Sequence, residues 1–162
     1  MDMALIIGDL NTTSGCQAYS ADGLPGIRDD EVLPDDLRKF YELCGGADLF
    51  LGTRYPTHIV SPDNFVPANP IVLVGLTSEQ LSDPTYQFSN SWYIIADNGS
   101  GEYITIDLNP NRLGYCYDSF WDTHPFDSTI IAYSFKDLLM HLISDHGKQY
   151  HRNWNVLGDA FP

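Results

Sequence analysis

The sequence has 162 residues, of which 43% are hydrophobic and 13% aromatic, enough for one packed globular domain. Eight basic residues against 22 acidic residues give a formal charge of -14 at pH 7. Because this charge repels phosphate groups, it argues against nucleic acid and membrane surfaces as partners.

Cysteine usage and the apolar segments indicate the compartment. Cys16, Cys44 and Cys116 are odd in number, widely spaced and without a CxxC pair, so neither a disulfide framework nor a zinc site is expected. The opening stretch from Met1 to Gly8 lacks the basic start and the length of a signal peptide, and no later run approaches a membrane span. We therefore expect a cytoplasmic protein. The oligomeric state stays open, with a monomer as the simpler expectation.

The first expected element follows an irregular lead-in. Residues 9–31 mix small and polar side chains, so we expect them to wrap the domain or stay mobile. Pro34, followed by two aspartates, suits a helix start. Apolar residues then recur with helical spacing at Leu37, Phe40, Tyr41 and Cys44. The pattern predicts a helix over residues 35–44 that ends at a glycine.

The middle of the chain carries weaker signals. Four prolines between Thr53 and Pro70 predict a long ordered loop or a set of edge pieces. The apolar run from Ile71 to Val74 predicts a short buried strand. Residues 77–91 have loop composition, with one helical turn expected over residues 78–81.

Three consecutive antiparallel strands form the strongest β signal. Residues 92–96 are apolar on both faces, residues 97–101 form a glycine-containing turn, and residues 103–108 alternate. A second turn at residues 109–111 leads to a third strand over residues 113–117.

A loop, a short strand and a helix follow. We expect a loop over residues 118–128, a strand over residues 129–132, and a helix from Phe135 to Ile143 with Ser134 as its cap. Residues 150–162 form an extended tail. Together the elements predict one α+β domain over residues 1–162, with at least three consecutive antiparallel strands.

Three groups of residues could carry chemistry, and each has a simpler structural explanation. His141, Asp145, His146 and His151 could hold a metal, but histidines also favour the C-terminal end of a helix. The Asp-Asn-Gly-Ser-Gly-Glu run at residues 97–102 could bind a cation, but it matches neither a calcium loop nor a Walker lysine motif, and a hairpin turn explains it. We therefore expect no metal and no cofactor.

A hydrolase would need a nucleophile. Cys44 could meet His58 or His124, but Cys44 lies on the predicted apolar stripe and the chain has no nucleophile elbow. We therefore do not expect an enzyme.

The loop over residues 118–128 is the best candidate for a partner-binding surface. It combines aromatic side chains with carboxylates, a composition typical of a binding hot spot with a charged rim. The candidate residues are Asp118, Phe120, Trp121, Asp122, Phe126 and Asp127. Trp121 and Phe126 could instead plug the edge of the core, and the sequence supports both interpretations equally.

Four motifs in this order resemble the SUKH superfamily of Smi/Knr-like domains. The helix entry is Leu-Pro-Asp-Asp-Leu-Arg-Lys-Phe-Tyr at residues 33–41, with Gly45-Gly46 behind it. The tryptophan strand and glycine turn span residues 92–102, and residues 103–108 with Gly114-Tyr115 are similar to the next two strands. The closing helix at residues 135–143 falls where the family has one. The resemblance covers about residues 32–146.

The resemblance implies an α+β fold with its core at about residues 32–146 and a central, mostly antiparallel meander flanked by helices. It also implies a binding role. Many bacterial members neutralise a toxin encoded beside them, often a nuclease, so it implies an immunity protein of a polymorphic toxin system that occludes its cognate toxin. The charge of -14 independently suits a basic partner, although solubility alone also explains it. The alternative is a regulatory protein-interaction module of the fungal Smi/Knr type without a toxin partner.

Overall fold

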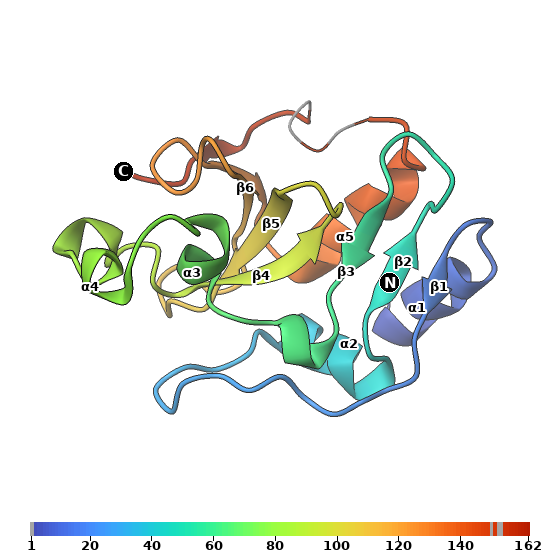
Figure 1. Cartoon of the computed structure of the whole chain (residues 1–162). Coiled ribbons are helices and arrows are strands. Elements are labelled where there is room, and N and C mark those ends of the chain that lie inside the picture. The colour runs from blue at the N-terminus through green and yellow to red at the C-terminus, as the bar shows by residue number, and fades with distance from the viewer. Residues whose placement is uncertain (1, 150, 152–153) are drawn as a thin grey trace.

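The chain forms one continuous antiparallel sheet in which each strand pairs with the next strand in the sequence (Figure 1). The computed structural model describes residues 2–149, 151 and 154–162. In this part of the chain the strands are β1 (Gln17–Ala18), β2 (Ala47–Leu49), β3 (Thr57–Ile59), β4 (Trp92–Asp97), β5 (Glu102–Asp107), β6 (Cys116–Phe120), β7 (Thr129–Ala132) and β8 (Gly158–Asp159). This order confirms the predicted α+β class and its antiparallel meander.

Helices cover the sheet. The α-helices of the described chain are α1 (Met3–Asn11), α2 (Asp35–Leu43), α3 (Ala68–Val72), α4 (Ser78–Leu81) and α5 (Phe135–Asp145), with 3-10 turns η1 (Pro62–Asn64) and η2 (Pro84–Tyr86). Figure 1 shows α5 behind the sheet and α3 in front of β4. Helix α1 packs against both α2 and α5. No helix among the described residues is long and apolar enough to cross a membrane.

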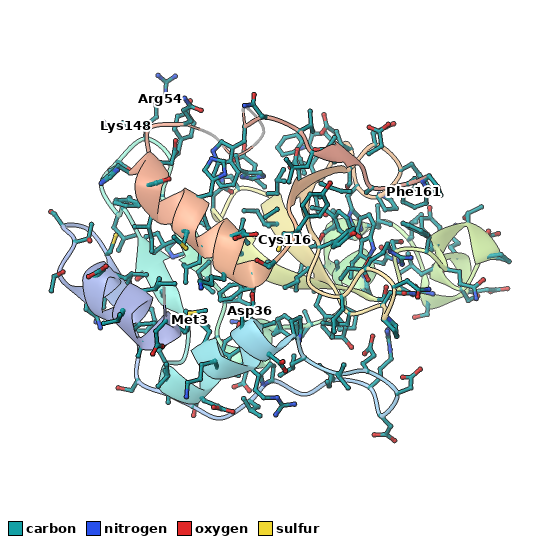
Figure 2. The ribbon with its side chains drawn as sticks, turned by 180° about the vertical axis from the view of Figure 1, so that it is seen from behind. Met3, Asp36, Arg54, Cys116, Lys148 and Phe161 are labelled. Atoms are coloured by element: carbon teal, nitrogen blue, oxygen red, sulfur yellow. The ribbon has the colours of Figure 1, made fainter. Side chains whose placement is uncertain are left out.

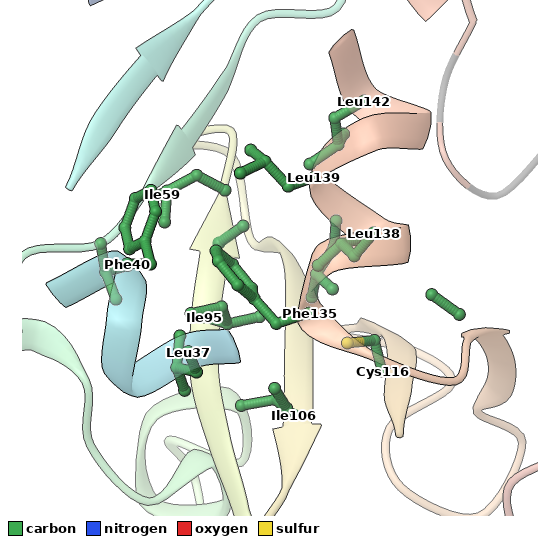
Figure 3. Close-up of a cluster of buried hydrophobic side chains, with 14 of the residues drawn as sticks. Leu37, Phe40, Ile59, Ile95, Ile106, Cys116, Phe135, Leu138, Leu139 and Leu142 are labelled. Atoms are coloured by element: carbon green, nitrogen blue, oxygen red, sulfur yellow. The ribbon is translucent and has the colours of Figure 1, made fainter. Parts of the chain in front are cut away.

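The main core lies between the sheet and the pair α2 and α5 (Figure 3). Both helices place an apolar stripe there, because their leucines and phenylalanines recur every three or four residues. Phe40 of α2 and Phe135 of α5 meet edge to face with ring centroids 4.9 Å apart, and both are fully buried. Each such buried side chain contributes roughly 1.5–3 kcal/mol.

The opposite face of the sheet carries a smaller aromatic and polar cluster. Trp92 of β4 stacks on Tyr117 of β6 with centroids 4.1 Å apart. Beside them, the buried carboxylate of Asp107 accepts hydrogen bonds from Tyr117 Oη at 2.7 Å and Arg112 Nε at 2.8 Å. The Arg112 guanidinium in turn lies 3.9 Å from the ring centroid of Phe88. The loop after β6 packs against this cluster.

Several predicted elements match closely. The helix predicted over residues 35–44 is α2, with Cys44 as its C-cap, and the turn predicted over residues 78–81 is α4. The predicted hairpin is β4 and β5, and Gly99 and Gly101 in its turn have φ of 82° and 81°, which glycine tolerates without strain. The strand predicted over residues 129–132 is β7, and the last predicted helix is α5.

Two predictions for segments that join the main elements are wrong in this structure. Residues 9–31 are not irregular throughout: α1 runs to Asn11, and residues 17–18 form the edge strand β1. The run from Ile71 to Val74 is not a strand, because residues 68–72 form α3 and Leu73 caps it. A four-residue apolar run does not distinguish a buried strand from a buried helical turn.

The third strand of the meander also lies further along than predicted. It spans residues 116–120, whereas residues 113–115 belong to the turn before it. Asp118 and Ser119 are polar but buried in β6, where Ser119 Oγ lies 2.8 Å from Thr105 Oγ1. The hydrophobic pattern that predicts the strand ends before Asp118 and Ser119, although the strand itself continues through both residues. The predicted tail contains β8, and positions 150, 152 and 153 of that tail lie outside the described residues.

Candidate partner-binding site

The six predicted site residues divide between a strand and a loop. Asp118 and Phe120 belong to β6, which corrects the prediction that the loop begins at residue 118. Trp121, Asp122, Phe126 and Asp127 lie on the tight loop between β6 and β7 and are exposed. The structure therefore brings all six into one region and leaves four of them on the open surface.

Asp118 is part of the interior. The residue is 7% exposed, and its Oδ1 lies 3.0 Å from Nε2 of His151, which is also 7% exposed. This contact joins the end of β6 to the C-terminal tail. Asp118 therefore positions the loop and is a poor candidate for direct contact with a partner.

Trp121 is open to solvent, whereas Phe126 is half-buried at the edge of the core. Trp121 is 60% exposed, and its ring lies beside Phe120, with centroids 5.7 Å apart, and over the hairpin turn at Gly101. Phe126 is 49% exposed and packs against Phe161, which lies on the core, at 5.3 Å between centroids and against Tyr86 of η2 at 5.6 Å. Large aromatic side chains left this open on a folded surface are the residue types enriched in protein interfaces.

His124 anchors the loop. It is 5% exposed, its Nε2 lies 2.9 Å from Oδ1 of Asn69 in α3, and its ring meets Trp92 edge to face at 5.5 Å between centroids. Burial lowers the pKa of His124 to about 3, so the imidazole is neutral at physiological pH. The sequence suggested only a catalytic role for this histidine, because its partner Asn69 lies 55 residues away.

Backbone hydrogen bonds make the loop compact. The amides of Thr123 and His124 both donate to the carbonyl of Phe120, at 3.0 and 2.9 Å. The amide of Asp127 donates to the carbonyl of Thr123 at 2.8 Å. A loop fixed in this way loses little conformational entropy when a partner binds, so its exposed aromatic rings are preorganised.

The residues considered for nucleophilic catalysis do not form an activated site. Cys44 is 2% exposed, and burial raises the pKa of its thiol to about 11, so it stays protonated. Nδ1 of His58, in β3, lies 2.5 Å from Oδ1 of Asp48 in the neighbouring strand β2. None of the histidine hydrogen bonds within the described residues joins a hydroxyl or thiol side chain.

The histidines considered as metal ligands make separate contacts. His141 stacks on Trp154 with centroids 3.6 Å apart, His151 bonds Asp118, and His146 caps the C-terminal end of α5 with φ of 56°. Among the described residues, no three His, Cys, Asp or Glu side chains are grouped to hold a metal ion. The arrangement of these histidines is that of packing and capping groups.

Comparison with known proteins identifies the family. The model of the SMI1 / KNR4 family (SUKH-1) matches residues 30–141, which hold α2, the meander from β2 to β7 and most of α5. The chain is also similar to a Bacillus subtilis (strain 168) protein named immunity protein YokJ, with 42% identity over 166 aligned residues that cover 99% of this chain and 96% of that protein. The chain therefore belongs to the SMI1/KNR4 (SUKH-1) family.

Proposed function

We propose that this protein is an immunity protein that binds a cognate toxin and blocks it by occlusion. The observation that carries the proposal is the 42% identity to an immunity protein across almost the full length of both chains. A match of this extent includes the loops, where binding residues concentrate, as well as the scaffold. The protein would act in the cytoplasm, where it would meet the toxin, and by binding instead of catalysis.

We further propose that the aromatic loop, residues 120–127, contributes the central contacts. Trp121 and Phe126 supply open aromatic surface on a preorganised backbone. Asp122 and Asp127 add negative charge beside them. A net charge of -14 would draw a basic toxin domain towards this surface.

The test is neutralisation in cells. The toxin candidate is the C-terminal domain of the protein encoded next to this chain, expressed from an inducible promoter with and without the chain. Rescue of growth, together with a stoichiometric complex of the two purified proteins, is the expected result. Growth arrest despite full expression of the folded chain would overturn the proposal and favour a regulatory interaction module.

A further inference from the structure

The C-terminal segment, residues 157–161, returns to the sheet beside the aromatic loop. In Figure 1 the C-terminus lies next to the orange loop that follows β6, and Figure 2 labels Phe161 of this segment from the other side. The segment pairs with β7 through β8. Directly after this pairing the amide of Ala160 donates to the carbonyl of Ser128 at 3.0 Å, and both residues are buried. The backbone therefore places Phe161 at the base of the aromatic loop.

The ring of Phe161 connects the loop to the aromatic cluster on this face of the sheet. Its centroid lies 5.3 Å from that of Phe126 in the loop, 4.6 Å from Phe88 and 6.0 Å from the fully buried Trp92. The other ring that Phe126 meets within the described chain is Tyr86, which lies on η2, a 3-10 turn without buried residues. Phe161 is therefore the ring contact that joins Phe126 to the core.

The aromatic loop is thus held by two side-chain contacts from other parts of the chain. His124 joins it to α3 through Asn69, and Phe126 joins it to the C-terminal segment through Phe161. Loss of one contact should allow the loop to open locally while the sheet stays folded, because local opening costs less free energy than global unfolding. A partner that binds the closed loop would then bind more weakly, in proportion to the fraction of loops that remain closed.

From these contacts we infer that Phe161 is a positioning residue for the aromatic loop. It holds Phe126, and with it the backbone that presents Trp121, in the arrangement that a partner would meet. The role in partner binding rests on the proposed function, whereas the effect on the loop does not. If Phe161 contributed only to overall stability, its loss would affect the loop no more than the loss of any other buried side chain.

Amide hydrogen exchange of the ¹⁵N-labelled full-length chain tests the effect on the loop without any toxin. The amide of Asp127, which donates to the carbonyl of Thr123 at 2.8 Å, reports on closure of the loop. Phe161→Ala should raise its exchange rate by about tenfold, because the loop opens more often. Phe161→Leu keeps most of the apolar volume and should return the rate to within about threefold of the wild type. An unchanged rate in Phe161→Ala would overturn the inference.

Two further variants separate a local effect from a general loss of stability. Leu10→Ala removes a fully buried side chain of α1, so it should lower the melting temperature without changing exchange of the Asp127 amide. Val156→Ala alters a 59% exposed side chain just before the C-terminal segment and should change neither quantity. If Leu10→Ala accelerates exchange at Asp127 as much as Phe161→Ala does, Phe161 contributes only stability and the inference is wrong.

A double-mutant cycle with the toxin domain tests the role in binding. Phe161→Ala should raise Kd by about five- to tenfold in the wild-type background. It should raise Kd by less than about twofold when Phe126 is already replaced by Ala, because the ring contact with the loop is then absent. Equal effects in both backgrounds would overturn the positioning role. If the wild-type chain does not bind the toxin domain, the proposed function fails, and the exchange rates still decide whether Phe161 holds the loop.

Discussion

Trp121 and His124 are three residues apart on one loop and have opposite environments. His124 is buried against Asn69 and Trp92, whereas Trp121 lies open above the hairpin turn. The first holds the backbone of the loop and the second presents its surface. Their substitutions should therefore affect different measurements.

Replacing Trp121 by Ala should weaken partner binding more than it affects folding. Because the side chain is 60% exposed, we expect the free energy of unfolding to fall by less than about 1 kcal/mol. Loss of a central aromatic anchor should cost about 2 kcal/mol or more of binding, roughly 30-fold in Kd. Calorimetric titration with the toxin domain and thermal melts measure the two effects.

Leu5→Ala is the control for this substitution. Leu5 is 62% exposed and lies on α1, whose main contacts with other helices and strands of the described chain are with α2, α5 and β1. Its replacement should change neither Kd nor the melting temperature appreciably. An unchanged Kd with a sharply lower melting temperature for Trp121→Ala would assign this side chain to packing.

His124 should make stability depend on pH. Its pKa is about 3 in the folded chain and about 6.5 when unfolded, so the unfolded state binds more protons between these values. The stabilisation is complete above about pH 6.5 and is lost as the pH falls towards 3. Between about pH 7 and about pH 5 the loss should be about 2 kcal/mol.

Urea unfolding of the wild type and of His124→Gln at several pH values isolates this effect. Glutamine does not titrate, so the variant should start less stable at neutral pH and lose about 2 kcal/mol less than the wild type on acidification. All carboxylates are common to both proteins and cancel in the difference. Parallel pH curves would show that His124 does not carry the effect.

The helices and strands that could be predicted from the sequence are those with a clear periodic spacing of apolar residues. Helix α2 and helix α5 each show leucine and phenylalanine at helical spacing, and β4 and β5 flank a glycine turn. Helix α1 shows the same periodicity, with Met3, Ile6, Ile7 and Leu10 on one face behind the cap Asp2, so the sequence holds a helix signal here that the prediction of an irregular lead-in misses.

The remaining elements depend on contacts distant in sequence. β6 continues through Asp118 and Ser119 because His151 and Thr105 satisfy their polar groups. The composition of the loop was enough to predict it as a partner-binding surface. The burial of Asp118 and the anchoring role of His124 could not be predicted, because both depend on partners distant in the sequence. A hydrogen-bond partner 33 or 55 residues away leaves no local pattern.

Helix α1 should be an integral part of the fold. Leu10 is fully buried, and α1 contacts α2, α5 and β1. Leu10→Ala should lower the free energy of unfolding by about 2–5 kcal/mol, because it removes buried methyl groups and leaves a cavity. Leu5→Ala on the outer face of the same helix should cost less than about 0.5 kcal/mol. If denaturant titrations show that both substitutions lower the free energy of unfolding by a similar small amount, then α1 is not an integral part of the fold.

The molecule as a whole has far more acidic side chains than basic side chains that could pair with them. Only two of the ion pairs among the described residues use an arginine, and the other two use histidines. With 22 acidic and 8 basic residues, most carboxylates contribute to one negative field. Such a field acts at a distance, before any contact forms, so it should govern how fast a basic partner arrives and not how long it stays.

Stopped-flow association with the toxin domain separates these two effects. Raising NaCl from about 20 mM to about 500 mM shortens the screening length several-fold, so the association rate constant should fall by about tenfold or more while the dissociation rate changes little. Trp121→Ala should do the reverse: it should speed dissociation and keep the salt dependence of association, because it removes contact area without removing charge. An association rate constant that does not change with NaCl would show that the charge of the protein serves solubility. Association through the aromatic loop would then proceed without electrostatic steering.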